Sequence, residues 1–209
     1  MGIPVLIMGE SGSGKSTSLR NFEPDEIGIF NVASKPLPFR KQMSSIADAA
    51  DYRLIVNTLN KHNLKRYAID DSQYLLSFEF FDHANEKGYE KFTNMALNFS
   101  NLIRFVQLRT PLDCIVYFLH HIDITYDSEG NKKIKAKTIG KMLDEKLTVE
   151  GLFSIVLLCQ SDNTGRHYFV TQSMGKSTAK SPMEMFPLEI DNDLKLVDKT
   201  IREYYNMEV

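Results

Sequence analysis

Residues 9–16 read Gly-Glu-Ser-Gly-Ser-Gly-Lys-Ser, and this stretch decides the fold that the sequence predicts. It fits the pattern G-x-x-x-x-G-K-[ST], in which a glycine-rich loop binds the phosphates of a nucleotide. Residues 3–8 form an apolar segment ahead of it and predict a strand, and residues 16–20 can begin a helix behind it. Strand, loop and helix in this order are the context that the motif requires.

Each residue type in the loop has a role in holding phosphate. The glycines let the backbone curl so that successive N–H groups point inward, and the start of a helix adds partial positive charge. Lys15 supplies a cation for the β- and γ-phosphates, and Ser16 supplies a hydroxyl for Mg²⁺. We therefore predict that ATP and Mg²⁺ bind at Gly9, Glu10, Ser11, Gly12, Ser13, Gly14, Lys15, Ser16 and Thr17.

The composition is that of one globular domain in aqueous solution. A chain of 209 residues can bury a substantial core, and the net charge of −2 gives no basic field that would attract nucleic acid. Any contact with DNA must then come from a local patch or from several copies of the chain. No apolar run approaches the ~20 residues of a membrane span. We expect no signal peptide, no membrane partner, a cytoplasmic location and reduced cysteines at Cys114 and Cys159.

Apolar segments that alternate with helical patterns predict a mostly parallel sheet. Further strands are expected at residues 27–32, 64–69, 113–119, 152–159 and 167–170. Helices are expected at residues 51–60, 89–108, 140–146 and 193–205, the last with Asn192 or Asp191 as its N-cap. Residues 122–137 are typical of a hairpin with its turn at 127–131, which would extend the sheet with antiparallel strands. The predicted fold is one α/β domain spanning residues 1–209.

Two carboxylates follow the predicted third strand. Residues 66–71 read Arg-Tyr-Ala-Ile-Asp-Asp, which matches the Walker B pattern. A carboxylate at the carboxyl end of a parallel strand near the loop can hold Mg²⁺ through water. We assign this role to Asp70, together with Ser16. Asp71 is either a partner of Asp70 or the group that orients the attacking water, and the simplest alternative is a solvated pair at a strand end.

The predicted fourth strand ends in Phe-Leu-His-His at residues 118–121. In P-loop ATPases with an inserted strand, a polar residue at this place senses the γ-phosphate, and we assign this role to His120. A histidine can hydrogen-bond a phosphate or its water, and its charge can respond to nucleotide. The alternatives are a core histidine and a metal site formed with His121 and Asp123.

The densest basic stretch lies in the predicted hairpin. Its lysines are Lys132, Lys133, Lys135 and Lys137. Alternation places the last three on one face of a strand, where they could follow the phosphate backbone of DNA. The alternative is a solubilising edge strand, whose lysines discourage pairing with another sheet.

Four segments together resemble a known family. They are the loop at residues 9–16, Lys-Pro-Leu-Pro-Phe at 35–39, Ile-Asp-Asp-Ser-Gln-Tyr at 69–74 and Ala-Lys-Ser-Pro at 179–182. Over nearly its whole length the chain resembles phage-encoded AAA/RecA-like P-loop ATP-binding proteins, a group that includes Sak-type single-strand annealing recombinases. The resemblance implies a RecA-like core, self-association as a ring or filament, and action on single-stranded DNA in the cytoplasm of the host cell. Phage single-strand-binding or replication proteins would be further partners.

The resemblance also implies a role for the late loop at residues 174–181. Lys176 and Lys180 occupy a place from which RecA-like subunits reach the ATP of a neighbour, where a cation stabilises the transferring phosphoryl group. The alternative is an exposed loop with ordinary lysines. RecA-like enzymes usually carry a catalytic glutamate after the second strand, whereas residues 31–35 contain no acid. Either Asp71 takes over as base, or hydrolysis is slow and ATP acts as an assembly switch.

Three functions remain open on this basis. The first is an ATPase of phage recombination or replication that acts on single-stranded DNA. The second is a nucleotide-gated interaction module in a replisome or host-takeover complex. The third is a small-molecule P-loop kinase, which is disfavoured because residues 71–73 do not form the expected D-R-x motif and no arginine-rich lid is evident.

Overall fold

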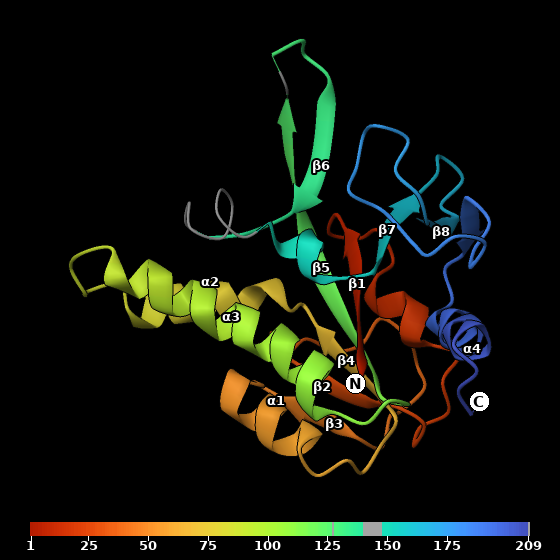
Figure 1. Ribbon diagram of the computed structural model, residues 1–209, viewed down its shortest axis with the longest axis horizontal. Coiled ribbons are helices and arrows are strands. Elements are labelled where there is room, and N and C mark those ends of the chain that lie inside the picture. The colour runs from red at the N-terminus through yellow and green to blue at the C-terminus, as the bar shows by residue number, and fades with distance from the viewer. Residues whose placement is uncertain (127, 140–147, 209) are drawn as a thin grey trace.

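The computed structural model describes residues 1–126, 128–139 and 148–208. Its centre is a mixed sheet of nine strands, in which the order is β3-β2-β4-β5-β1-β7-β8-β9 and β6 pairs with β5 (Figure 1). The strands are β1 (Ile3–Gly9), β2 (Gly28–Asn31), β3 (Ile46–Asp48), β4 (Arg66–Asp70), β5 (Ile115–Tyr126), β6 (Lys132–Ala136), β7 (Ile155–Ser161), β8 (His167–Val170) and β9 (Glu189–Asp191). The predicted helix at residues 140–146 lies outside the described residues, as does residue 127 of the predicted turn.

The first six strands of this order, from β3 to β7, are parallel, and the antiparallel pairs are β5–β6, β7–β8 and β8–β9. This confirms a mostly parallel sheet with an antiparallel extension. Strand β5 is inserted between β1 and β4, so the strand that leads into the glycine-rich loop does not pair directly with the strand that ends in Asp70. The carboxyl ends of β1 and β4 still lie at one edge of the sheet, on either side of the middle of β5.

Helices cover both faces of the sheet (Figure 1). One face packs against α1 (Tyr52–Leu59), α2 (Gln73–Asp82) and α3 (Glu90–Arg109), with Phe99 and Phe118 in their shared core. The other face packs against α4 (Leu194–Tyr204) and the one-turn 3-10 helix η1 (Ser16–Leu19), with Leu19 and Val197 in its core. A second 3-10 turn, η3 (Val149–Leu152), precedes β7. Burial on both faces explains why the central strands read as continuous apolar runs.

Strand β5 is longer than the sequence indicated. Its first half lies buried between β1 and β4, and its second half leaves the body and pairs with β6 as a hairpin (Figure 1). The register pairs Ile122 with Ala136 and Tyr126 with Lys132, which confirms the predicted hairpin. A single strand therefore connects the core of the sheet to the lysine-bearing arm.

The sequence missed several elements, each for a physical reason. Helix α2 has apolar side chains around most of its circumference, so it shows no helical period. Strands β3 and β9 have only three residues each. The helix expected after the glycine-rich loop is a 3-10 turn of four residues, too short to supply the partial charge of a full helix. The N-cap of α4 is Asp193, whose carboxylate accepts hydrogen bonds from the N–H groups of Lys195 and Leu196.

Candidate nucleotide-binding site

The glycine-rich loop connects β1 to η1 and has the backbone geometry of an anion-binding nest. Gly12 and Gly14 have φ angles of 81° and 101°, which side chains other than glycine rarely tolerate. A Cβ on Gly14 would also lie 2.7 Å from the ring of His167. Within the described residues, the N–H groups of Gly12, Gly14 and Lys15 donate no hydrogen bond. Such N–H groups are available to a ligand with negative charge.

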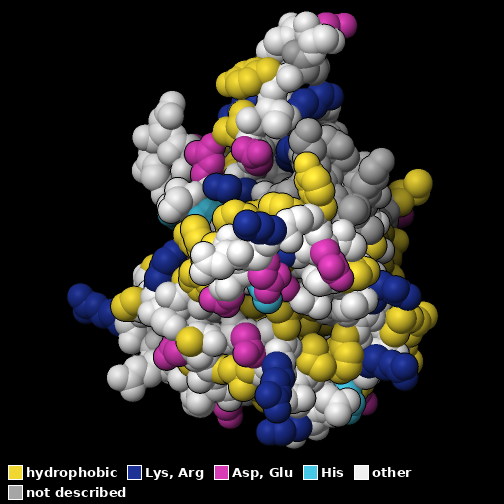
Figure 2. All heavy atoms as spheres, turned by 90° about the vertical axis from the view of Figure 1, so that its left-hand side faces the viewer, with side chains coloured by type: hydrophobic (Ala, Val, Ile, Leu, Met, Phe, Trp, Pro, Cys, Tyr) yellow, Lys and Arg dark blue, Asp and Glu magenta, His cyan; other side chains and the backbone are white. Residues whose placement is uncertain are grey.

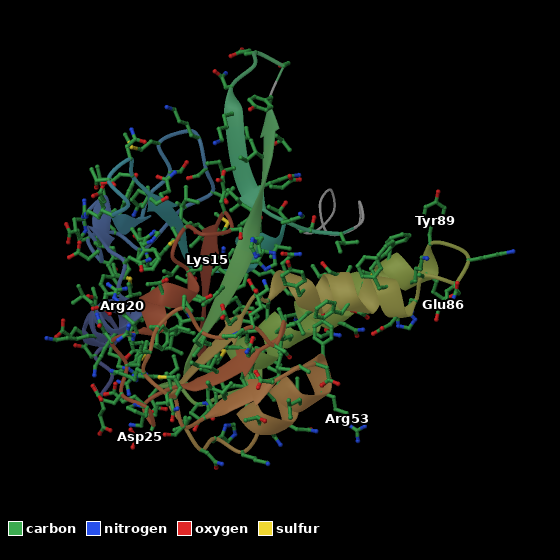
Figure 3. All side chains as sticks on the ribbon, turned by 180° about the vertical axis from the view of Figure 1, so that it is seen from behind. Lys15, Arg20, Asp25, Arg53, Glu86 and Tyr89 are labelled. Carbon is green, nitrogen blue, oxygen red and sulfur yellow. The ribbon has the colours of Figure 1, made fainter. Side chains whose placement is uncertain are left out.

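Lys15 folds back over the loop that carries it. Its side chain is largely buried, and its Nζ donates to the carbonyl oxygens of Gly9 at 2.9 Å and Glu10 at 2.8 Å. Burial lowers the pKa of this ammonium group, although nearby carboxylates act in the opposite direction. An anion that reached Lys15 would therefore stabilise the charged form of the side chain. Figure 3 shows Lys15 at the edge of the sheet from which the hairpin rises.

The most informative contact joins the loop to β4. Ser16 Oγ donates a hydrogen bond of 2.7 Å to Asp70 Oδ1, across 54 residues of sequence. Burial raises the pKa of Asp70, which lies at the end of β4, and the bond from Ser16 only partly offsets this shift. A hydroxyl and a carboxylate in contact are the oxygen ligands that Mg²⁺ uses together with nucleotide phosphates. The residues present therefore fit the predicted metal site.

Asp71, the next residue, has a different environment. It adopts a left-handed φ of 58° and accepts hydrogen bonds from Lys35 Nζ at 2.7 Å and His121 Nε2 at 3.1 Å. Burial opposes ionisation of Asp71, but these two partners prevail and lower its pKa to about 2. The ring of Tyr74 contacts both partners, with Lys35 Nζ at 4.8 Å from its centroid and the His121 ring edge-on at 5.9 Å. Asp71 is thus a fixed anion in this arrangement.

The structure places His120 away from these carboxylates. Its side chain is fully buried beside Phe99, and its Nε2 lies 2.7 Å from the carbonyl oxygen of Lys137. Because Nε2 faces a carbonyl it carries the proton, so Nδ1 accepts from the Ser72 hydroxyl at 2.9 Å. Burial lowers the pKa of His120 to about 4. This geometry matches the alternative of a core histidine, and it is His121 that contacts Asp71.

Side chains behind the loop hold it in place. Cys159 Sγ donates to the Ser13 carbonyl at 3.0 Å, and Asn192 Nδ2 donates to the Gly14 carbonyl at 3.2 Å. Arg20 Nη1 donates in turn to the Asn192 carbonyl at 2.6 Å. Both cysteines are free and buried, as the sequence predicted. The loop is therefore braced from β7 and from the start of α4.

The hairpin lysines are divided between two faces of β6. Lys133 and Lys135 alternate with the buried residues Ile134 and Ala136, whereas Lys132 lines a hollow shared with the glycine-rich loop. Lys137 follows the end of β6, and its backbone N–H donates to the carbonyl of His121 at 2.9 Å. β6 ends at Ala136, but this bond continues its pairing with β5 by one residue, so the expectation of three lysines on one face of a strand stays a prediction for Lys137.

The late loop passes beside both the hairpin and the sheet. The carbonyl of Lys176 accepts from the N–H of Ile134 at 2.9 Å, and Lys180 exchanges two backbone hydrogen bonds with Val156 of β7. The Lys176 side chain is exposed and that of Lys180 is half-buried. Buried Glu150 fixes the same region, since its Oε1 accepts from the Ala136 N–H at 2.6 Å and from Thr178 Oγ1 at 3.1 Å. The predicted reach of these lysines to another subunit stays a prediction.

Several residues that shape the site gave no signal in the sequence. The spacing of the chain did not single out Lys35, Cys159 or Asn192, because only the sheet order brings them to the loop and to Asp71. His121 was weighed only as a metal ligand. Among the described residues, no group of three or more histidine, cysteine or acidic side chains could hold a metal ion, so the alternative with His120, His121 and Asp123 finds no support.

The chain was also compared with known proteins. It matches no protein-family model and no curated protein. In the part of the chain that the structure describes, no helix has the length and apolar character needed to cross a membrane.

Proposed function

We propose that the protein binds ATP with Mg²⁺ at residues 9–17 and hydrolyses it, as a RecA-like P-loop ATPase that acts on single-stranded DNA. The hydrogen bond between Ser16 and Asp70 carries this proposal. Two residues 54 positions apart meet only if the loop and the end of β4 form one site. The inserted strand β5 between β1 and β4 supports a RecA-like core, in keeping with the sequence resemblance.

Each group of the site would have its own role in binding the nucleotide and Mg²⁺. The N–H groups of the loop would bind phosphate oxygens, and Lys15 would exchange its two carbonyl partners for phosphate. Ser16 and Asp70 would hold Mg²⁺, which neutralises charge on the phosphates during transfer. Nucleotide with Mg²⁺ would thereby offset the cost of burying the charged forms of Lys15 and Asp70.

The residue that would act as catalytic base and activate water has the weakest candidates in this site. Asn31, at the end of β2, pairs in register with Asp70 and uses its side chain to bond Lys35 and Asp48. It cannot act as a base. Asp71, which directly follows Asp70, is our candidate for this role, and Lys35 and His121 already hold it. We therefore expect slow hydrolysis unless DNA or assembly frees Asp71.

A short path connects this carboxylate to the proposed DNA-binding arm. His121 donates from its side chain to Asp71 and accepts with its backbone from Lys137, directly after β6. His120 Nε2 holds the carbonyl of the same Lys137. DNA bound along the hairpin would pull on the residues that position Asp71. This path supports a coupling between DNA binding and turnover.

Calorimetric titration of the purified chain with ATP, in the presence and absence of Mg²⁺, tests the nucleotide site. We expect affinity to rise with Mg²⁺ in the wild type and this rise to disappear in Ser16→Ala. Lys61→Ala, an exposed lysine at the end of α1, serves as the control and should behave as the wild type. Absence of ATP binding by the folded chain would overturn the proposal.

The DNA function has its own test. We expect a single-stranded oligonucleotide at low salt to raise the ATPase rate or to change the oligomeric state. If neither responds across a broad titration while ATP still binds, the DNA function is refuted and the nucleotide site stands.

Because Lys35 and His121 already bind Asp71, a second candidate function is also supported. It is a nucleotide-gated interaction module. Such a protein would bind ATP tightly, turn it over negligibly even with DNA, and bind a protein partner only in one nucleotide state. Single-turnover measurements with and without DNA distinguish the two functions.

A further inference from the structure

Lys35, in the loop that follows β2, has a fixed backbone and an exposed side chain. Asn31, at the end of β2, accepts from the Lys35 N–H at 3.1 Å and donates through Nδ2 to the Lys35 carbonyl at 2.8 Å. The next residue, Pro36, restricts the backbone of Lys35 further. The side chain itself is 56% exposed. The loop therefore presents a flexible cation from a rigid point at the carboxyl edge of the sheet.

The loop does not depend on the side chain of Lys35 to keep its shape. Besides the bonds from the end of β2, Ser34 Oγ accepts from the N–H of Ala49 at 2.9 Å, which joins this loop to the loop after β3. Lys35 Nζ donates to Asp71 Oδ2 at 2.7 Å and lies 4.8 Å from the centroid of the Tyr74 ring. Ion pairs with an exposed member add little to stability. A more highly charged anion can therefore replace Asp71 as the partner of this lysine.

Lys35 and the glycine-rich loop lie on opposite sides of Asp70. The strand order β2-β4-β5-β1 places Asp70 between them, and the register pairs Asn31, which holds the Lys35 backbone, with Asp70 itself. Burial lowers the pKa of Lys15, and the charge of Lys35 acts in the same direction, so the two ammonium groups are near enough to repel each other. An anion between them would be attracted to both. The terminal phosphate of a bound nucleotide would be such an anion, because we expect Lys15 to bind the β- and γ-phosphates.

Long-range attraction alone does not explain a phosphate ligand at this place. Basic and acidic side chains are interspersed over the surface on the side of α1–α3 (Figure 2), and the net charge of the chain is −2. Attraction of a nucleotide must therefore come from cations near the site itself. Lys15 and Lys35 are such cations, since one bonds the glycine-rich loop and the other bonds Asp71, the neighbour of Asp70.

We propose that Lys35 binds the terminal phosphate of the bound nucleoside triphosphate and thereby makes the site prefer ATP to ADP. This role rests on the proposed nucleotide site at residues 9–17. Without nucleotide, Lys35 Nζ stays on Asp71. With triphosphate, the flexible side chain transfers its hydrogen bond to a phosphate oxygen, because the terminal phosphate carries more charge than a carboxylate. ADP has no phosphate at this place, so Lys35 remains on Asp71.

The transfer would also change the environment of Asp71. Of the two side chains that hold this carboxylate, Lys35 would leave and His121 would stay. Nucleotide would then release one partner of the proposed base, and the hairpin, through His121, would control the other. Binding of triphosphate alone would not free Asp71, which agrees with the slow hydrolysis expected above.

Calorimetry with Mg²⁺ and two nucleotides, ADP and the hydrolysis-resistant analogue β,γ-imido-ATP, tests the preference. Lys35→Gln should lower the affinity for the analogue about ten-fold or more and leave the affinity for ADP within about two-fold. Lys35→Arg keeps the charge and should restore most of the preference. Lys41→Gln, in the same loop, is the matched control and should change neither affinity, because Lys41 Nζ donates to the carbonyl of Phe22 at 2.9 Å and not to Asp71.

Asp71→Asn separates a phosphate ligand from a structural ion pair. If Lys35 only holds the loop, Asp71→Asn and Lys35→Gln break the same pair and should shift the two affinities alike. If Lys35 binds the terminal phosphate, Asp71→Asn frees it for this role. The affinity for the analogue should then rise about two-fold or more relative to that for ADP, which is opposite in sign to the effect of Lys35→Gln.

The outcomes separate the role of Lys35 from the proposed function. If the wild type and Lys35→Gln bind both nucleotides with the same ratio of affinities, the nucleotide site stands and Lys35 is not its phosphate ligand. The same conclusion follows if Lys35→Gln and Asp71→Asn shift this ratio in the same direction. If the folded wild type binds neither nucleotide, the proposed function fails, and the role of Lys35 fails with it.

Discussion

The two edges of the parallel sheet each carry a buried group of charged side chains, and the two groups are organised differently. At the amino edge, Asp198 accepts from Arg66, Arg202 and Tyr117 at 2.7, 2.7 and 3.0 Å. At the carboxyl edge, Lys15 Nζ donates to carbonyl oxygens of its own loop, and Asp70 accepts from the neutral hydroxyl of Ser16.

The first group is closed. Arg202 is completely buried, and its remaining N–H groups donate to the carbonyls of Asp113 and Lys65, so the charges of Asp198, Arg66 and Arg202 all have partners. Such a network fastens α4 to the starts of β4 and β5. In the second group, Lys15 and Asp70 have weaker partners than Asp198 and Arg202 have, so their charges are available to a ligand. We interpret this as the difference between a structural network and a binding site.

The largest expected effect is at the closed network. Asp198→Asn leaves two arginines without their anion, so the free energy of unfolding should fall by about 3–5 kcal/mol. Chemical denaturation measures this loss. Lys199→Ala breaks an exposed pair with Glu203 on the same helix and should cost no more than about 0.5 kcal/mol. A loss below about 1 kcal/mol in Asp198→Asn would show that the network is not structural.

The second-largest effect is expected at Lys15, in the group at the carboxyl edge. Lys15→Ala should reduce ATP affinity about 100-fold, which is about 2.7 kcal/mol, and abolish turnover. The free energy of unfolding without nucleotide should change by less than about 1 kcal/mol, since Lys15 bonds only its own loop. Equilibrium binding and denaturation of the same preparation provide both values. Unaltered ATP affinity would refute the assignment of the phosphate site.

The third prediction separates the two adjacent carboxylates by pH. The folded-state pKa of Asp71 is lowered to about 2, so its ionisation stabilises the fold above about pH 4 and this contribution disappears as the pH falls towards 2. Asp71→Asn should therefore cost about 1 kcal/mol at pH 7 and progressively less in acid. Burial raises the pKa of Asp70, so ionisation of this group lowers the free energy of unfolding as the pH rises above its pKa in the unfolded chain.

It follows that Asp70→Asn should stabilise the nucleotide-free protein at pH 7 while removing the effect of Mg²⁺ on ATP binding. Denaturation curves between pH 3 and 7 compare the two variants. The same sign for both at pH 7 would contradict the two environments described above.

The smallest expected effect concerns the hairpin. Replacing Lys133 by Gln should lower the slope of log affinity against log salt for single-stranded DNA by about 0.7, with a few-fold loss of affinity. Lys132→Gln is the comparison, because Lys132 faces the glycine-rich loop and should alter ATP affinity more than DNA affinity. Fluorescence anisotropy of a labelled oligonucleotide measures the slopes. Identical behaviour of the two variants would remove the distinction between the faces of β6.

The parts of the fold and site that the sequence predicted share a local origin. The glycine-rich loop, Asp70 and the hairpin follow from motifs and turn residues that act over a few positions, and the apolar strands follow from burial on both faces. Helix α2 was missed because it buries Gln73 and Ser77 and exposes Phe78 and Phe81, so its apolar residues do not recur with a helical period. His120 was assigned a role from its place at a strand end, but its orientation depends on Ser72 and on the backbone of Lys137, 17 residues away.

The environment of Asp71 could not be predicted for a similar reason. Lys35 and His121 lie 36 and 50 residues from Asp71 and meet it only after β2, β4 and β5 have paired. Contacts that depend on the order of the strands in the sheet produce no periodic pattern in the sequence. The loops that follow β2 and β3 meet in the same way, through the parallel pairing of these two strands.

Strand β5 has a mechanical consequence. It runs for twelve residues, about 40 Å, from between β1 and β4 out to the tip of the hairpin. An extended ladder bonded at both ends transmits displacement far better than a flexible tether of that length. The glycine-rich loop begins beside His121, near the middle of this strand. A dye attached at Ser128 should therefore change its emission when ATP binds there, which would make the arm a fluorescent reporter of the nucleotide state.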